Sequence, residues 1–300
     1  MAWATAAGNR LLAWDDPDYP RAFLELTDPP IVLFCKGNAS LLNAPSLAMV
    51  GSRNASPAGL RTAEEFAESF TASGLNVVSG LALGIDAAAH RGALLGGDNS
   101  VASTIAIVGT GIDRVYPPRN RDLAHQIAQR GAIISEFALE TPPLKNNFPR
   151  RNRLISGISE GVLVVEAAIG SGSLITARCA AEQGKEVFAI PGSIHSPFSK
   201  GCHRLIKDGA KLVESAQDVR EELKYPEPVR VRSTTRSSAA STADAEERKL
   251  LDALGYDPVS PDEVCASTGW PIDRVLRSLL QLELSGSVIQ SAGGKVQRVS

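Results

Sequence analysis

Pro143–Ala177 reads PLKNNFPRRNRLISGISEGVLVVEAAIGSGSLITA, and the order of elements in this stretch indicates the fold. A basic segment leads into a helical pattern, which is followed by a short apolar strand, GVLVVEAA. A glycine turn at 170–173 then opens a second helix. A continuous apolar strand set between two helices is typical of a parallel sheet that is covered on both faces.

The same strand–turn–helix unit repeats outward in both directions from this stretch. Six further apolar runs, each followed by a helical pattern, are SLAMVGSR, LNVVSG, ASTIAIVGTG, GAIISEF, EVFAIPG and AKLVES. The helix after SLAMVGSR has Ser56 as N-cap and Pro57 in its first turn, and Gly74 is expected to end it. Residues 46–224 are therefore predicted to form an α/β domain, an extended Rossmann-like, doubly wound, mostly parallel sheet.

The segments that flank this domain carry different patterns. Residues 1–45, turn-rich with one apolar strand, IVLFC, are predicted to be an N-terminal extension that packs on the core. Residues 225–244 are rich in Ser and Thr without apolar periodicity, and they indicate a flexible linker. Residues 245–300 hold three helical patterns and a hairpin at Gly293-Gly294, which is the pattern of a small C-terminal winged helix-turn-helix domain.

The charge balance limits what the winged helix can do. It has six basic residues (Arg248, Lys249, Arg274, Arg277, Lys295, Arg298) and eight acidic ones (Glu246, Glu247, Asp252, Asp257, Asp262, Glu263, Asp273, Glu283). Phosphate neutralisation dominates the affinity of duplex-binding domains, which are accordingly basic. We therefore expect this module to contact protein, or to bind DNA only weakly.

Composition points to a reduced, cytoplasmic protein. The formal net charge is −2, so a nucleic-acid site would have to be a local patch. The four cysteines are scattered and the four histidines have no metal-ligand spacing, so neither a disulfide, a metal nor a cofactor is predicted. No apolar run is long enough to span a bilayer, and no signal peptide leads the chain.

The basic segment of the opening stretch is the strongest candidate site. Lys145 and the cluster Arg150, Arg151 and Arg153 suit phosphates, and Phe148 offers a flat face on which a base can stack. Positive charge at a helix N-terminus opposes the helix dipole, which favours an anion there over a solvated basic helix with a core Phe148. Helical spacing places Arg150 and Arg153 on one face and Arg151 on another.

Other candidates lie at the carboxyl ends of the predicted strands, where ligands bind in such sheets. Arg53, after the first strand, could fork two phosphate oxygens, or could pair with Asp86 or Glu136. Gly109-Thr110-Gly111 resembles part of a dinucleotide fingerprint but lacks its third glycine, so a tight strand-to-helix turn is favoured over a nucleotide site. For Glu136 and Glu166, helix capping or pairing with arginine is favoured over catalysis.

Several long motifs in one order resemble the bacterial DNA-processing protein A family, DprA or Smf. They include Asp28-Pro29-Pro30, Lys36-Gly37-Asn38, Gly51-Ser52-Arg53, SGLALGIDAAAH, GTGIDRVYP, SEF, FPRRNRLISGIS, EAAIGSGSLITA and Pro191-Gly192. The resemblance covers about residues 19–215 strongly. Family members often carry an N-terminal helical domain before the Tyr-Pro pair, and with 18 residues ahead of Tyr19 that domain is expected to be absent or truncated.

The resemblance implies a function without catalysis. It implies binding of single-stranded DNA, loading of the RecA recombinase, protection of incoming strands during natural transformation, and a homodimer formed through the Rossmann domain. The residues that it places on the strand, together with those chosen on chemical grounds, are Ser52, Arg53, Gly80, Lys145, Phe148, Arg151, Arg153, Ser171, Gly172 and Ser173.

Two alternatives from other classes remain open. A nucleotide hydrolase of the phosphoribohydrolase type would carry a catalytic Glu within three residues of the glycine turn, where this chain has Ile175, Thr176 and Ala177. A winged-helix regulator that binds double-stranded DNA is disfavoured by the acidic balance of residues 245–300.

Overall fold

The computed structural model describes residues 2–97, 102–225, 250–251, 253–254, 258–284, 286–291 and 294–298. The chain divides into two compact units, Met1–Val229 and Arg230–Ser300. The predicted linker over 225–244 lies, after Tyr225, outside the described residues.

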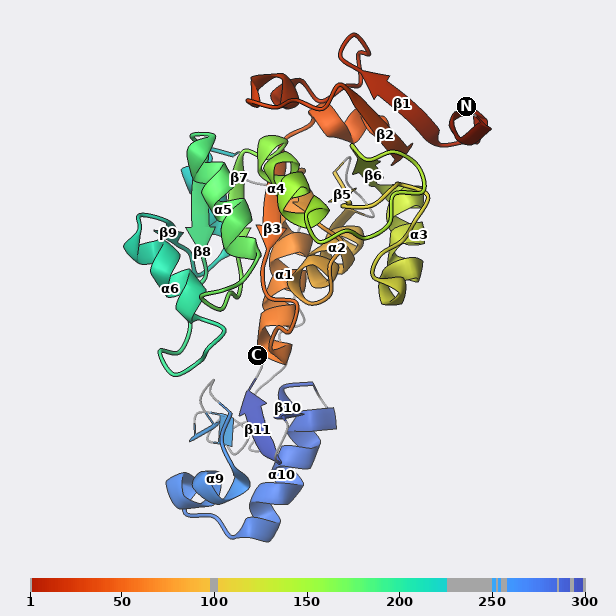
Figure 1. The fold of residues 1–300 in the computed structure, drawn as a ribbon. Helices are drawn as coiled ribbons and strands as arrows, with labels where there is room; N and C mark the ends of the chain where they lie inside the picture. Colours follow the sequence, from red (N-terminus) through yellow and green to blue (C-terminus); the bar gives the residue numbers. More distant parts are fainter. Residues whose placement is uncertain are drawn as a thin grey trace. The chain divides into compact units, whose positions relative to one another are not determined.

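The first unit is built on a nine-stranded sheet in the order β1-β2-β6-β5-β4-β3-β7-β8-β9 (Figure 1). The strands are β1 (Asn9–Ala13), β2 (Val32–Gly37), β3 (Ser46–Val50), β4 (Asn76–Ser79), β5 (Thr104–Ile107), β6 (Ala132–Ser135), β7 (Gly161–Val164), β8 (Glu186–Ala189) and β9 (Lys211–Leu212). The helices are α1 (Pro57–Ala72), α2 (Ile85–Gly96), α3 (Arg121–Arg130), α4 (Asn147–Gly157), α5 (Ser173–Glu182), α6 (Lys200–Lys207) and α7 (Ala216–Glu222). Short 3-10 helices are η1 (Ala2–Thr5), η2 (Arg21–Glu25), η3 (Ala39–Asn43) and η5 (Pro118–Asn120).

The pairing of the strands confirms the doubly wound, mostly parallel sheet. From β6 across to β9 every neighbouring pair is parallel. β1 and β2 differ, because β2 pairs antiparallel with both β1 and β6. The segment expected to pack on the core as an extension thus contributes two strands to the same sheet.

The order of the strands reverses direction at the middle of the sheet. From β3 the chain moves outward through β4, β5 and β6, and it then returns to place β7 on the other side of β3. Val50 and Val164 are partners in this central pair. Ligands of open α/β sheets bind in the crevice at such a switch point, outside the carboxyl ends of the strands.

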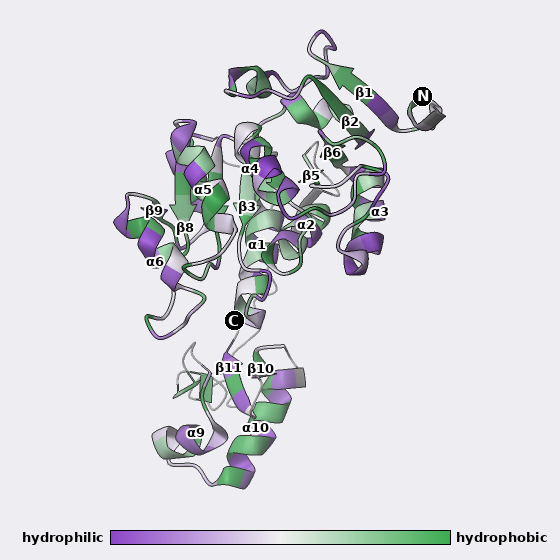
Figure 2. Ribbon diagram, viewed as in Figure 1, coloured by the Kyte–Doolittle hydropathy of each residue, from purple (hydrophilic) through white to green (hydrophobic). Residues whose placement is uncertain are grey.

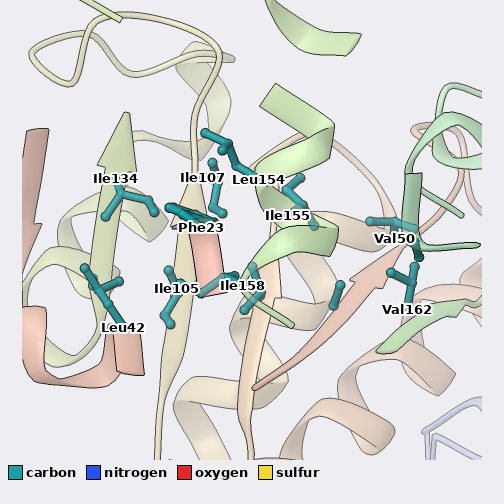
Figure 3. Packing of buried hydrophobic residues seen from close by; sticks show 14 of the residues in the cluster. Phe23, Leu42, Val50, Ile105, Ile107, Ile134, Leu154, Ile155, Ile158 and Val162 are labelled. Atoms are coloured by element: carbon teal, nitrogen blue, oxygen red, sulfur yellow. The ribbon is translucent and has the colours of Figure 1, made fainter. Parts of the chain in front are cut away.

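The central strands are buried on both faces, as their continuous apolar sequences predict. Ala48 and Val50 pack into a core that includes α4 and α5, part of which Figure 3 shows. Their neighbours Leu47 and Met49 point the other way, into the core formed with α1 and α2. In Figure 2 the central strands are mostly hydrophobic, in keeping with this double coverage.

The predicted limits of α1 are confirmed. The Ser56 side chain accepts a hydrogen bond from the Gly59 N–H at 3.0 Å, and Pro57 begins the helix. Gly74 follows the helix with φ +90°, a backbone conformation that strains any residue with a Cβ.

The second unit contains α9 (Pro261–Thr268), α10 (Ile272–Leu284) and an antiparallel hairpin of β10 (Val288–Ser291) and β11 (Lys295–Arg298). Ser260 and Glu263 form a reciprocal capping box at the start of α9. Most of the first predicted helix, AEERKLLDALG, lies outside the described residues. The described helices and hairpin close on a small apolar core. Across the described ranges of both units, no helix combines the length and hydropathy of a membrane span.

Candidate nucleic-acid interface

A cleft of about 730 Å³ lies at the carboxyl ends of β3 and β7, at the switch point of the sheet. Eight of the ten predicted strand-binding residues line it: Ser52, Arg53, Lys145, Phe148, Arg151, Ser171, Gly172 and Ser173. They come from three segments that are distant in sequence: the loop after β3, residues 145–151 at the start of α4, and the glycine turn that opens α5. The other two, Gly80 and Arg153, do not line the cleft.

The loop after β3 forms one wall, and Glu166 holds it in place. The Ser52 N–H donates to the Glu166 carbonyl oxygen at 2.7 Å. The carboxylate of Glu166 accepts hydrogen bonds from the Ser56 N–H at 2.9 Å and from the Ser56 hydroxyl at 2.6 Å. Glu166 therefore caps the N-terminus of α1, as predicted, and its oxygens are engaged in structure.

The glycine turn that follows β7 forms the opposite wall. Ser171 and Ser173 are joined by a hydrogen bond between their hydroxyls at 2.7 Å. A Cβ added at Gly170 or Gly172 would meet nothing within 4 Å, so these positions open onto free space. The turn therefore exposes backbone at the start of α5, where N–H groups without a helical partner favour an anion.

Phe148 lies near the guanidinium of Arg53 and near a second aromatic ring. Its side chain is half-buried, and the guanidinium of Arg53 lies 5.8 Å from the ring centroid. On the described part of the chain, neither Arg53 nor Lys145 forms an ion pair, and both are exposed. The alternative in which Arg53 pairs with Asp86 or Glu136 is therefore not what the structure shows.

Arg151 lines the floor of the cleft, but its guanidinium is turned into the protein. The residue is 5% exposed, and Nη1 donates to the carbonyl oxygens of Gly80 (2.6 Å) and Ile107. Burial lowers the pKa of Arg151 to about 10, which leaves it charged at neutral pH. Burial likewise raises the pKa of Asp86, and the charge of Arg151 opposes that shift. Arg151 thus adds positive potential at the floor of the cleft, while its N–H groups hold the ends of β4 and β5 together.

The place of Gly80 follows from Arg151. A Cβ at this position would lie 2.1 Å from Nη2 of Arg151, so only glycine leaves room for the buried guanidinium. The Gly80 N–H donates to Asp86 at 3.1 Å. Gly80 is therefore a support beneath the cleft.

Arg153 is held by a carboxylate on the far side of α4. It pairs with Glu136, which also lies 3.5 Å from Arg150, while Asp28 lies 3.5 Å from Arg153. Burial raises the pKa of Glu136, and the two arginines act against that rise. The expected pairing of Glu136 with arginine is confirmed, as is the separation of Arg151 from the face shared by Arg150 and Arg153.

The cleft contains an aromatic residue that was not anticipated from the sequence. Tyr116, in the loop after β5, lines the cleft and is 43% exposed. Its ring centroid lies 5.7 Å from that of Phe148, with 39° between the ring planes. The sequence around this tyrosine shows only that it lies in a proline-containing loop, and it does not indicate that the ring meets Phe148.

Comparison with known proteins decides the family. Residues 10–224 match the family model described as DNA recombination-mediator protein A, and residues 234–294 match the DprA winged helix domain. The chain belongs to the DNA recombination-mediator protein A family. The first match spans the whole nine-stranded sheet except Asn9, the first residue of β1.

Relatives of this family are similar over most of the chain. Protein Smf of Escherichia coli is 42% identical over 301 residues, which cover 99% of this chain and 79% of the relative. DNA processing protein DprA of Streptococcus pneumoniae is 47% identical over 210 residues, 70% of this chain and 73% of the relative.

Two solved structures have the same fold. DprA of Streptococcus pneumoniae matches with a TM-score of 0.67 at 46% identity, covering 72% of this chain and 75% of that one. DprA of Helicobacter pylori, whose structure describes a single-stranded DNA binding mode, matches with a TM-score of 0.65 at 30% identity. That match covers 72% of this chain and 97% of the Helicobacter chain.

Proposed function

We propose that this chain binds single-stranded DNA in the cleft between β3 and β7 and acts as a recombination mediator without catalytic activity of its own. One observation carries the proposal. Arg53 and the pair Lys145 and Phe148, about ninety residues further along the chain, line one cleft together with the open glycine turn at 170–173. An exposed guanidinium, an ammonium and an aromatic face are the combination that binds a strand with little dependence on its base sequence.

The structure of DprA from Helicobacter pylori supports the choice of ligand, because that relative has the same fold and is described as binding single-stranded DNA. By the role of the family, the bound strand would be incoming DNA during natural transformation. The chain would protect that strand and help to load RecA, acting as a homodimer through its Rossmann domain.

A hydrolase of the phosphoribohydrolase type is the weaker alternative. Such an enzyme needs a carboxylate that can reach the bound nucleotide, yet the cleft-lining residues after the glycine turn are Ile175 and Thr176. Asp86 is the one carboxylate among the described cleft-lining residues. It is 6% exposed and accepts the N–H groups of Gly80 and Ala82.

The winged helix also fits a role other than reading duplex DNA. In α10, the side chains of Ile272, Leu276 and Leu280 are 45%, 50% and 56% exposed. They lie four residues apart and therefore share one face of the helix. An apolar stripe suits contact with protein better than contact with phosphates, in line with the acidic balance of this module.

Fluorescence anisotropy with labelled oligonucleotides tests the proposal directly. The full chain is titrated against single-stranded and duplex forms of one sequence at fixed salt. Preferential binding of the single strand is expected, and Arg53→Ala and Lys145→Ala should each weaken it. Equal affinity for both forms, or none for either, would refute the proposal. Light scattering and a RecA filament assay on the same preparation test the dimer and the loading role.

A further inference from the structure

Tyr116 and Phe148 form a pair of aromatic rings within the cleft. Their centroids are 5.7 Å apart and their planes are inclined by 39°. The two rings come from separate elements, the loop after β5 and the first turn of α4. Both line the cleft, and the exposed fraction of Tyr116 is 43%.

The protein supports Phe148 from one side. The backbone of Gly109 lies so close to Phe148 that a Cβ at position 109 would be 3.0 Å from the ring. The Arg53 guanidinium carbon lies over the ring, 5.8 Å from its centroid, at the outer limit of a cation–π contact. Arg53 has no ion pair to break within the described chain, so it can move outward to admit a flat group.

The spacing of the rings decides which kind of strand can use both. In a duplex, each strand advances by about 3.4 Å per base, which keeps neighbouring bases in contact with each other. Rings whose centroids are 5.7 Å apart cannot each stack on one of two bases that keep this rise. The two bases must unstack from each other, and each must stack on an aromatic side chain of the protein instead.

We propose that Tyr116 and Phe148 each stack on one of two neighbouring bases, so that the cleft selects strands whose bases are weakly stacked, above all runs of pyrimidines. This rests on the proposed function and adds to it a class of strand and a second stacking residue. A strand of stacked purines must first lose its own stacking, and the resulting preference arises from stacking strength and not from hydrogen-bonded readout of the bases.

The experiment measures the affinity of the full chain for dT and dA oligonucleotides of equal length at one salt concentration. Four variants are compared with the starting protein: Tyr116→Phe, Tyr116→Ala, Phe148→Ala and the double alanine variant. The starting protein should bind the dT strand more tightly than the dA strand. Tyr116→Phe should keep both the affinity and the preference, because the ring face is retained.

Tyr116→Ala should lose on the order of 5- to 150-fold in affinity for the dT strand, the range for one stacked base. It should lose less for the dA strand, so that the preference shrinks. Because each ring holds its own base, the fold-losses of the two alanine substitutions should multiply in the double variant. Thermal melting checks the folding of each variant.

Three results would overturn the inference and leave the proposed function standing. Tyr116→Ala could bind like the starting protein while Phe148→Ala loses affinity. Tyr116→Ala could have no effect once Phe148 is already alanine, which would mean that Tyr116 only orients its neighbour. The dA strand could bind as tightly as the dT strand. If the starting protein binds no single strand at all, the proposed function fails first.

Discussion

The cations predicted to bind the strand differ in how freely their charge can meet a phosphate, and this difference predicts a salt dependence. Arg53 and Lys145 are exposed and form no ion pair on the described chain, whereas Arg153 is held by Glu136. For single strands, the slope of log K against log salt is about −0.7 for each phosphate that is neutralised. Removing one free cation should therefore reduce the steepness of the slope by about 0.7.

The magnitude follows from the same relation. A slope of about 0.7 per cation means that a tenfold change in salt alters the contribution of that cation roughly fivefold, or about 1 kcal/mol. The affinity that Arg53→Ala or Lys145→Ala loses relative to the starting protein should thus be roughly fivefold larger at 0.1 M salt than at 1 M salt. Their melting temperatures should stay close to that of the starting protein, because both side chains are exposed.

Arg153→Ala is the matched control, and we expect it to show the opposite pattern. Its side chain is 17% exposed and its partner Glu136 only 5% exposed, so removing it leaves a buried carboxylate with the more distant Arg150. The melting temperature should fall, and the salt slope should stay unchanged. Anisotropy titrations at four or more salt concentrations, with melting curves of each variant, measure both quantities. If Arg153→Ala flattens the slope as much as Arg53→Ala does, the division of the cations is wrong.

Three further outcomes are expected. Phe148→Ala should cost about 1–3 kcal/mol of single-strand affinity at every salt concentration, measured by anisotropy, and a salt-dependent loss would argue against stacking. Glu166→Ala should lower both stability and strand affinity, because the loop that carries Ser52 and Arg53 loses the carboxylate that holds its Ser56 end, while the Ser52 N–H keeps its bond to the backbone carbonyl of residue 166. Thermal melting and anisotropy measure the two effects, and unchanged affinity would show that the carboxylate does not position the loop. Burial lowers the pKa of His90 to about 3, so the imidazole stays neutral in the folded state. Because the unfolded chain takes up a proton at its ordinary pKa of about 6.5, the free energy of unfolding should fall as the pH drops below about 6.5. The fall should be about 1.4 kcal/mol per pH unit, down to a pH of about 3. Denaturant unfolding of the starting protein and His90→Asn across this range isolates the contribution, and parallel pH profiles would contradict it.

The sequence predicted the sheet and the meeting of its loops because both follow from local pattern. Continuous apolar runs such as SLAMV can be satisfied only by burial on two faces, and the carboxyl ends of parallel strands must share an edge. Arg53 and Lys145 could therefore be placed near one another before any coordinates. Strand β1 gave no such signal, because among its five residues only Leu12 is buried.

The fate of Arg151 could not be predicted from helical spacing. Spacing separates it from Arg150 and Arg153, but it does not say whether the separated face meets solvent or protein. The guanidinium of Arg151 is buried because it finds two acceptors inside the protein, the carbonyl oxygens of Gly80 and Ile107 at the ends of two strands. Burial of a guanidinium depends on such distant partners, and a single sequence does not reveal them.

The balance between charge and stacking also bears on how many copies must act together. The net charge is −2, and the described cleft offers two free cations and two aromatic rings per chain. At about 1 kcal/mol for each cation and about 1–3 kcal/mol for each stacked base, stacking should contribute more than charge. Contacts to so few nucleotides give modest affinity for one chain, whereas two linked clefts on one strand gain through effective concentration. A homodimer that binds a single strand with both clefts would therefore hold it far more tightly than one chain, and a strand too short to reach both clefts should lose that gain.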